Sequence, residues 1–331
     1  MKIGFKFHPD KVGYKLGSLK PGQNRGFCGD EMTALSLRKE LLRLPEVECC
    51  ELFNTAPPFK LDIMVYFHED PPAKSCAKKS VVYLQRGFNN GSDKALQLYQ
   101  KRSYDGYMFI SKKLLDLHKS MGYNGVFIPT AADTEYMRPL PPKDECRFDV
   151  AYVGNDIKGF HRTMKYVYPA TDFNFGLFGN WRSYSAFKDC LSPHGFFLRY
   201  FKIQYRRQFK RISQGQVLYE DLPVLYSSAK IVLNCTHQDN VDWDVITGRT
   251  YDVLACNGFL VSDIVPSAAE KFGDCAVFTT GDGDLTEKIK HYLKHEDQRL
   301  AIASKGREKI LQHHSFKHRA IDMLNYFKGL L

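Results

Sequence analysis

The stretch from Leu222 to Val265 reads LPVLYSSAKIVLNCTHQDNVDWDVITGRTYDVLACNGFLVSDIV, and its pattern decides the fold. After an opening with apolar residues at helical spacing, the β-branched run 230–235 predicts a buried strand. A polar loop follows, then a helical pattern over 249–256 and a second apolar strand over 259–262. Strand, loop, helix and strand form a βαβ unit, in which ligands bind beyond the carboxyl ends of the strands and helix N-termini attract anions. Arg249 stands at the start of that helix.

Length and composition limit the class of protein. A chain of 331 residues, 44% of them hydrophobic, is long for one core and favours two domains. Nine cysteines without a CxxC pair argue against a disulfide framework and a zinc site. The charged segment 1–13 is unlike a secretory signal and no long apolar run occurs, so we expect a cytoplasmic protein, with peripheral membrane contact left open. The formal net charge of +10 predicts an anionic partner, either nucleotide phosphates, acidic lipid or nucleic acid.

The first part of the chain alternates between strand and helix patterns. A long polar loop follows the first strand and ends at Asp30, which is placed to cap a helix over 31–44. This alternation predicts a parallel sheet covered by helices, in a domain that spans 1–138. Strands are expected at 2–7, 47–53, 63–67, 80–85, 106–111 and 125–129, and further helices at 93–101 and 112–120.

A second alternation begins beyond the proline-rich segment Pro139–Cys146, which reads as a linker. We expect a second domain over 139–314, and a last helix over 315–331 that returns to the first domain. Besides the central unit, strands are expected at 149–153, 173–178 and 276–279, a helix at 160–168, and helical structure from 285 onward.

Several motifs in the second half resemble those of one enzyme family. The resemblance begins at Val126–Asp133 and is carried by DVAYVGN (149–155), LFGNW (177–181), LPVLYSSAKIVLN (222–234), GRTYD (248–252), ACNGFLVSD (255–263), HYL (291–293) and HR (318–319). These resemble the group 1 glycosyltransferases of the spore-maturation type, which have the GT-B fold. The resemblance implies an α/β protein with two Rossmann-like domains facing a cleft, a C-terminal helical tail, and a nucleotide-sugar donor bound to the second domain.

The resemblance also implies a pair of acids. Many retaining enzymes of this fold have two acids with seven residues between them, and Asp244 and Asp252 have that spacing. Asp252 would hold the ribose of the donor and Asp244 its sugar hydroxyls, and with Arg249 they form the expected catalytic set. Asp252 ends an Arg-Thr-Tyr-Asp motif where the family usually has Arg-Thr-Phe-Glu. The alternative is that Arg249 and Asp252 only cap their helix.

Cations are expected beside the donor's diphosphate, because departure of the nucleotide leaves negative charge on its oxygens. The candidates are Arg249, Lys158 and Arg162, with a plain surface role as the alternative for Arg162.

Glycines and aromatic residues complete the expected donor site. Gly154 and Gly179 end predicted strands, where a missing side chain lets a ligand approach the backbone. Trp181 and Tyr219 either line the base pocket or belong to the core. The full set of expected donor-binding residues is Gly154, Asn155, Lys158, Arg162, Gly179, Trp181, Tyr219, Asn234, Arg249, Thr250 and Asp252.

The acceptor side is less defined by the sequence. If the reaction inverts the anomeric configuration, it needs a base from the first domain, and His8, Asp30 and His68 are the candidates. We expect neither a metal ion nor a cofactor, because the nucleotide-sugar is a co-substrate and this fold generally works without metal.

The stretch 196–212 is basic and aromatic, beyond what the family pattern needs. As a helix it would gather Phe197 and Phe209 near one face and basic residues elsewhere, which suits anionic membrane or nucleic acid. The alternative is a solvated helix packed by its aromatic face.

These observations predict a glycosyltransferase that uses an NDP-sugar, with UDP favoured over GDP, and that retains configuration without a metal. The acceptor would be a glycan, a lipid-linked sugar or DNA. One alternative is a glycosyltransferase that acts on modified DNA bases. Another is a catalytically silent module that binds sugar nucleotides, for which Asp252 in place of glutamate would be the sign.

Overall fold

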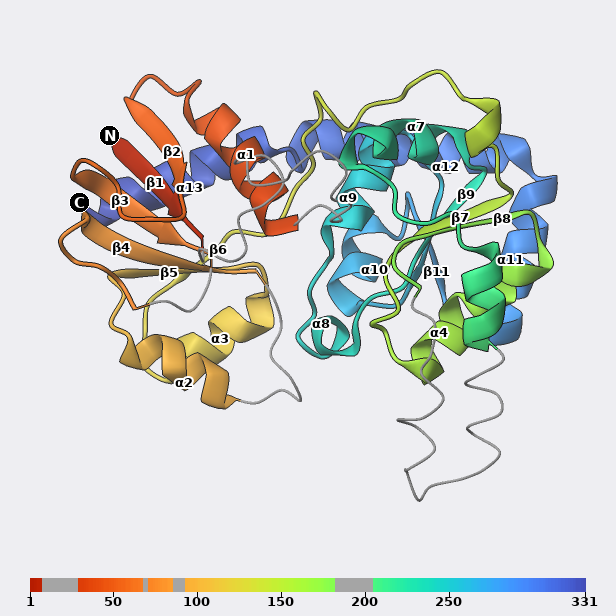
Figure 1. The fold of residues 1–331 in the computed structure, drawn as a ribbon, viewed down its shortest axis with the longest axis horizontal. Helices are drawn as coiled ribbons and strands as arrows, with labels where there is room; N and C mark the ends of the chain where they lie inside the picture. The colour runs from red at the N-terminus through yellow and green to blue at the C-terminus, as the bar shows by residue number, and fades with distance from the viewer. Residues whose placement is uncertain (8–28, 68–70, 86–92, 182–204) are drawn as a thin grey trace.

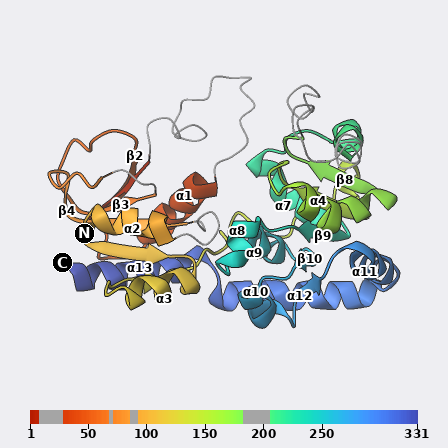
Figure 2. The ribbon, with the colours of Figure 1, turned by 90° about the horizontal axis from the view of Figure 1, so that it is seen from below.

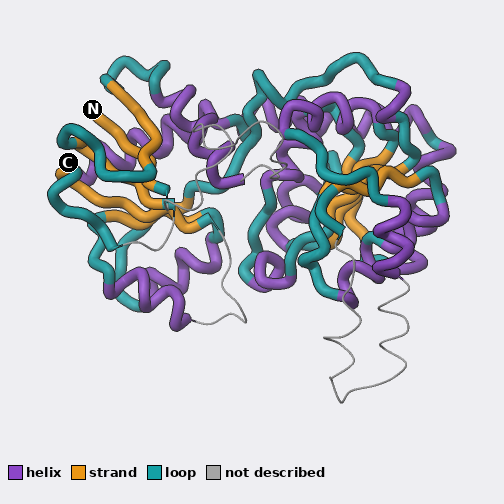
Figure 3. The backbone as a smooth tube through the Cα atoms, in the orientation of Figure 1, coloured by secondary structure: helices purple, strands orange, loops and turns teal. Residues whose placement is uncertain are grey.

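The computed structural model describes residues 1–7, 29–67, 71–85, 93–181 and 205–331. Figure 1 shows two domains side by side, and Figure 3 shows that each has a sheet covered by helices. The first sheet has six strands and the second has five. Every strand pair in both sheets is parallel. The α/β fold with two Rossmann-like domains is therefore confirmed.

The first sheet has the strand order β2-β1-β3-β4-β5-β6. Its elements are β1 (Lys2–Lys6), α1 (Gly29–Leu41), β2 (Cys49–Phe53), β3 (Leu61–Tyr66), β4 (Ala77–Leu84), α2 (Asp93–Lys101), β5 (Gly106–Phe109), α3 (Lys112–Ser120) and β6 (Val126–Phe127). The helices expected over 93–101 and 112–120 are confirmed. The helix expected over 31–44 runs instead from Gly29 to Leu41, because Pro45 disfavours helical backbone before it. Because α1 already begins at Gly29, Asp30 lies in its first turn and is not its N-cap.

The second sheet has the strand order β11-β10-β9-β7-β8. Its strands are β7 (Val150–Val153), β8 (Phe175–Phe178), β9 (Ile231–Asn234), β10 (Leu260–Asp263) and β11 (Val277–Thr279). The chain places β8 on one side of β7 and then β9 on the other, so the switch point of this sheet lies between β7 and β9. In open α/β sheets, ligands bind at such a point, beyond the carboxyl ends of the strands.

Helices cover both faces of the second sheet (Figure 1). They are α4 (Phe160–Tyr166), α7 (Leu222–Ser228), α8 (Gln238–Asp242), α9 (Gly248–Ala255), α10 (Pro266–Phe272), α11 (Asp282–Lys294) and α12 (Glu296–His313), with short 3₁₀ turns at Asp144–Cys146, Tyr168–Asp172 and Tyr219–Asp221. The chain ends with α13 (Phe316–Leu330). Within the described ranges, none of the helices is both long enough and apolar enough to cross a bilayer.

The last helix, α13, leaves the second domain and packs on the first (Figure 2). Phe316, Met323 and Phe327 lie in the same apolar core as the first sheet. Ala132, in the segment after β6, pairs with the chain that leads into α13: its N–H donates to the carbonyl of His314 at 3.0 Å, and its carbonyl accepts from the N–H of Phe316 at 3.0 Å. Two chain segments therefore cross between the domains side by side.

The loop between α8 and α9 also joins the domains. Trp243 and Val245 are buried in the apolar core of the first domain. Ser111 donates its hydroxyl to the carbonyl of Trp243 at 2.6 Å, and Lys113 donates to the carbonyl of Asp242 at 2.6 Å. The segment that leads into α9 is thus held by the opposite domain.

Candidate functional site

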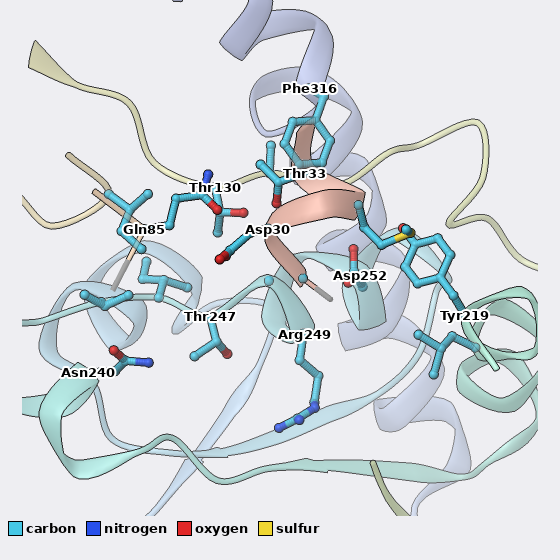
Figure 4. A pocket seen from close by; sticks show the side chains of 18 of the residues that line it. Asp30, Thr33, Gln85, Thr130, Tyr219, Asn240, Thr247, Arg249, Asp252 and Phe316 are labelled. Carbon is cyan, nitrogen blue, oxygen red and sulfur yellow. The ribbon is translucent and has the colours of Figure 1, made fainter. Parts of the chain in front are cut away.

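A cleft of about 270 Å³ between the domains gathers side chains from both (Figure 4). The first domain supplies Asp30 and Thr33 of α1, Gln85, which follows β4, and Thr130, which follows β6. The second domain and α13 supply Tyr219, Asn240, Thr247, Arg249, Asp252 and Phe316.

Helix α9 begins at this cleft, with Thr247, Gly248 and Arg249 all lining it. Thr247 is the N-cap residue, but its side chain makes no capping hydrogen bond. Its buried hydroxyl oxygen has no partner in the part of the chain that the structure describes. A Cβ added to Gly248 would come no closer than 4.0 Å to a neighbouring atom, the Oδ2 of Asp252, so the space is open. Because the first N–H groups of a helix lack internal partners, this start suits an anion or a hydroxyl-bearing ligand.

The guanidinium of Arg249 is fixed from two sides. Its Nη1 donates to Oδ1 of Asn234 at 2.7 Å, and the group lies over the ring of Tyr152, 5.3 Å from the centroid. Asn234 is held in turn, because its Nδ2 donates to the hydroxyl of Ser262 at 3.1 Å. Asn234 thus positions Arg249 and does not line the cleft. A cation held this rigidly can stabilise negative charge without reorganising.

A second cation, Lys158, follows β7 at the switch point. Its ammonium has no hydrogen-bond or ion-pair partner among the residues that the structure describes. Burial, and then the charge of Arg249, lower the pKa of Lys158 to about 8. A desolvated ammonium next to another cation lacks a counter-charge, which an anionic ligand would supply.

Arg162, by contrast, is neutralised within the protein. It forms an ion pair with Asp263, which is fully buried. Its Nε donates to the carbonyl of Thr236 at 2.8 Å, and Nη1 donates to Oε1 of Gln238 at 2.9 Å. Arg162 therefore anchors the loop after β9, and the cations of the crevice without an ion-pair partner in the described chain are Lys158 and Arg249.

Asp252 lines the cleft from the same helix start as Arg249 (Figure 4). Burial raises the pKa of Asp252 to about 8, with a further rise from Asp133 and an opposing effect of Arg249. A pKa of about 8 leaves this carboxyl largely protonated at neutral pH, so it can donate one hydrogen bond as well as accept.

Asp244 lies outside the cleft. Its backbone is left-handed, with a φ of 55°, and its Oδ1 accepts from the N–H of Ser267 at the start of α10, at 2.8 Å. Its neighbours Trp243 and Val245 are buried in the first domain, and this turns the carboxylate toward α10. The structure therefore does not bring together the predicted pair Asp244 and Asp252.

Gly154 and Gly179 let two loops pack on each other. Gly179 has a φ of 125°, and a Cβ there would lie 2.2 Å from the carbonyl oxygen of Gly154. A Cβ on Gly154 would lie 2.6 Å from the hydroxyl of Tyr152. Asn155 ties the same loops, since its Oδ1 accepts from the N–H of Asn180 at 2.8 Å. Close backbone packing accounts for both glycines without a ligand.

Among the aromatic and helix residues expected at the donor, Tyr219 reaches the cleft and Trp181 and Thr250 do not. Tyr219 stacks on Tyr136, with ring centroids 4.9 Å apart. Trp181 is buried and packs edge-on against Phe209 at 4.9 Å. Thr250 is buried inside α9.

Of the three candidate bases, Asp30 of the first domain lines the cleft, across from Arg249 and Thr247 (Figure 4). The other two candidate bases, His8 and His68, lie outside the described residues.

The basic stretch 196–212 is described only from residue 205, and 205–212 is helical. Tyr205 and Phe209 are buried in the core of the second domain. Arg206 pairs with Asp156 at 3.2 Å. The described part is thus packed by its aromatic face, and its exposed cations are Arg207, Lys210 and Arg211.

Thr247, Asn240 and Gln85 line the cleft although the sequence did not single them out. Threonine directly before a helical pattern is a capping signal that could have identified Thr247. Gln85 ends a predicted strand, where ligand-binding residues of parallel sheets gather. Asn240 lies in a polar stretch without a useful pattern. No group of three or more histidine, cysteine or acidic side chains suited to a metal gathers among the described residues.

Comparison with known proteins places this geometry in a family. Residues 161–325 match the family model described as Glycosyl transferase-like. No curated protein sequence matches the chain.

Solved structures share the architecture along the whole chain at low sequence identity. Sucrose-phosphate synthase from Thermosynechococcus elongatus has a TM-score of 0.67 and 12% identity, over 99% of this chain and 98% of that one. Anabaena Alr3699/HepE, solved with UDP and glucose, has a TM-score of 0.65 and 14% identity, over 99% of each chain. The T4 phage protein BGT, solved with UDP-glucose, has a TM-score of 0.61 and 13% identity, over 100% of this chain and 99% of that one. The family match and the shared two-domain fold together identify the chain as a glycosyltransferase of the GT-B type, with a Glycosyl transferase-like domain over residues 161–325.

Proposed function

We propose that the protein transfers a sugar from a UDP-sugar, bound to the second domain, to an acceptor held against the first domain. The observation that carries this proposal is Lys158, a desolvated cation without a counter-charge, close to Arg249 at the switch point of the second sheet. The preference for UDP is supported by HepE and phage BGT, which have the same fold and were solved with UDP-glucose or with UDP and glucose.

Each part of such a donor has a complement in the cleft or directly beside it, where Lys158 does not line the cleft but is coupled to Arg249. The diphosphate is bound by Lys158, Arg249 and the first N–H groups of α9, and these groups stabilise the charge that grows as the sugar leaves. The ribose hydroxyls bind Asp252, whose carboxyl group becomes ionised when it accepts two hydrogen bonds.

We infer that no divalent metal is needed, because the two cations and the helix start already supply positive charge. Calorimetry of UDP binding in excess EDTA tests this. The affinity should be unchanged by the chelator. Binding that disappeared with EDTA and returned with Mn²⁺ would show the inference to be wrong.

Retention of configuration is what the acid-pair resemblance implies, and it needs no base on the acceptor. Inversion is the second candidate, because Asp30 lies on the acceptor side of the cleft while Asp244 lies outside it. The anomeric configuration of the product, read by NMR, separates the two. If the enzyme inverts, Asp30→Asn should lower kcat by about 10²–10⁴-fold, whereas a retaining enzyme should lose far less.

The transfer itself is tested by UDP release from a panel of UDP- and GDP-sugars. Candidate acceptors are glycans, lipid-linked sugars and DNA with modified bases. One UDP-sugar should release UDP fastest, and the rate should rise with the correct acceptor. A protein that bound UDP but released none from any donor would be a silent binding module.

A further inference from the structure

A second cavity, of about 480 Å³, lies between the domains, beside the two crossing segments around Ala132 and His314, which we call the hinge. Ile110 and Ile246 line both this cavity and the cleft, so they form the partition between the two. The first domain contributes Phe127 and Pro129, and the second contributes α10 and one residue of α12. Figure 2 shows α3, α10 and α12 along the same side of the molecule. All lining residues belong to the described part of the chain.

Two lysines at the cavity have no direct ion-pair partner in the described chain, although Glu270 and Asp244 partly offset the charge of Lys271. Lys271 of α10 lines it and has no hydrogen-bond or ion-pair partner within the described ranges. Lys112 of α3, which is exposed, likewise has none there. Burial lowers the pKa of Lys271, and the charge of Arg319 lowers it further. Lys309 also lines the cavity, although it pairs with Asp274 at 2.9 Å.

Hydrogen-bonding groups accompany these cations. Tyr251 lines the cavity, and its hydroxyl is buried without a partner in the described chain. Ser267 and the carboxylates of Asp244 and Glu270 line it as well. The Oδ1 of Asp244 accepts from the N–H of Ser267 at 2.8 Å, which leaves lone pairs on that carboxylate. Carboxylates and a tyrosine suit the hydroxyl groups of a ligand, and lysines suit its charge.

We propose that this hinge cavity is a second ligand site, which binds a small phosphate monoester that also carries hydroxyl groups. Lys271, with Lys112 and Lys309 around it, holds the phosphate. Tyr251 and the two carboxylates hold the hydroxyl groups. The cavity exceeds the 270 Å³ of the cleft, so a bare phosphate ion would leave much of it unfilled.

Such a ligand would act on the donor site through the segment around Ile246, which lines both the hinge cavity and the cleft. Asp244 and Ile246 belong to the segment that leads into α9, and Tyr251 belongs to α9 itself. A ligand that touches both domains at the hinge also favours one spacing between them. Binding at the hinge and binding of UDP are therefore coupled, and the coupling is the same in both directions.

The test uses calorimetry with the full chain saturated with UDP. Glucose 6-phosphate is titrated as the probe, and inorganic phosphate and glucose are titrated separately as comparisons. Glucose 6-phosphate should bind, inorganic phosphate should bind more weakly, and glucose should not bind measurably. Lys271→Met should weaken the binding of glucose 6-phosphate at least about tenfold, since a charge-assisted contact is lost. Lys305→Met removes an exposed lysine of α12 outside the cavity and should change nothing.

Two further variants keep the test decisive if Lys271→Met does not fold. Lys112→Met alters an exposed position, and Tyr251→Phe removes only the hydroxyl; each should weaken binding severalfold. The UDP affinity of Lys271→Met, measured without glucose 6-phosphate, should equal that of the wild type, so failure here is distinct from failure of the donor assignment.

Three results would overturn the proposal. One is the absence of glucose 6-phosphate binding, or its displacement by UDP, which would place it in the cleft. Another is equal affinity for inorganic phosphate, which would exclude a role for the hydroxyl groups. The last is unchanged binding in folded Lys271→Met and Lys112→Met variants.

Discussion

Two helices begin at the cleft from opposite domains, and their first turns differ in charge. Helix α1 begins with Gly29, Asp30 and Glu31, so two carboxylates already occupy its first turn. Helix α9 has no acid in its first turn and presents Thr247 and Arg249. Both backbones carry the same partial positive charge at this end. Carboxylates of its own first turn therefore offset the charge at the N-terminus of α1, whereas α9 has none in its first turn and can accept an anion from outside.

This contrast gives the cleft one cationic and one acidic side, which in the proposed function are the donor side and the acceptor side. The leaving diphosphate needs positive charge, whereas an attacking hydroxyl needs a group that accepts its proton. The variants below test whether the two sides differ in the way that the charges indicate, beginning with the largest effect.

Arg249→Ala should lower kcat by about 10²–10³-fold, the usual effect of removing one group that stabilises a developing anion. The donor KM should change far less, because the charge grows only in the transition state. Initial rates against the UDP-sugar measure both. Thermal unfolding is the control, since Arg249 also bonds Asn234. An unchanged kcat in the folded variant would show that Arg249 does not stabilise the leaving diphosphate.

Lys158→Met should weaken UDP binding about tenfold or more, and Lys165→Met, an exposed neighbour on α4, should not. Because the pKa of Lys158 is about 8 in the empty site and bound phosphate favours the charged form, wild-type affinity should fall as the pH rises above about 8. The variant should lack this dependence. Calorimetry from pH 7 upward measures it, and identical pH profiles would contradict the role of Lys158.

Asp252→Ala should raise the donor KM about tenfold and leave kcat comparatively intact, since the ribose changes little during transfer. Asp252→Glu should keep donor binding if the family's geometry applies. Binding of uridine, which lacks phosphates, isolates this contact from that of Lys158. A fall in kcat equal to that of Arg249→Ala would mean that the two residues do not serve different parts of the donor.

The raised pKa of Asp252 also predicts how stability depends on pH. In the folded protein its pKa is about 8, against roughly 4 when unfolded, so the folded state binds the extra proton between these values. This contribution to stability is present at low pH and is lost as the pH rises through that window. Asp252→Asn, which stays neutral, should match the wild type near pH 4 and have the higher Tm at pH 8.

The smallest effect is expected far from the cleft. Neutralising Arg207, Lys210 and Arg211 together should weaken binding to anionic liposomes or DNA a fewfold, mostly at low salt. Arg206→Gln should matter less for that binding, because Arg206 is paired with Asp156. If neither ligand binds the wild type at low salt, the stretch has only a structural role.

Both sheets could be predicted from the sequence because buried parallel strands read as apolar runs separated by helical periods. Helix α10 was missed although Pro266 stands at its first position, a common helix start. The site was predicted less well, because spacing along the chain does not say which way a loop turns. Asp244 and Asp252 have the expected spacing, yet burial of Trp243 in the other domain turns Asp244 away.

The sequence also could not predict which charged side chains form ion pairs with each other in the folded protein. The sequence predicts the same role for Arg162 and Lys158, because both are cations that follow a strand. Asp263 neutralises Arg162, and only the folded structure shows that Lys158 has no comparable acid among the described residues.

The return of α13 has a consequence for how the protein is made. Phe316, Met323 and Phe327 complete a core whose other members lie mostly within residues 3–131, with Trp243 and Val245 from the second domain. A ribosome that has finished the first sheet has therefore not yet supplied one wall of its core. While the whole second domain is synthesised, the nascent first domain has an uncovered apolar face. A premature stop before α13 therefore destabilises the domain that was synthesised first.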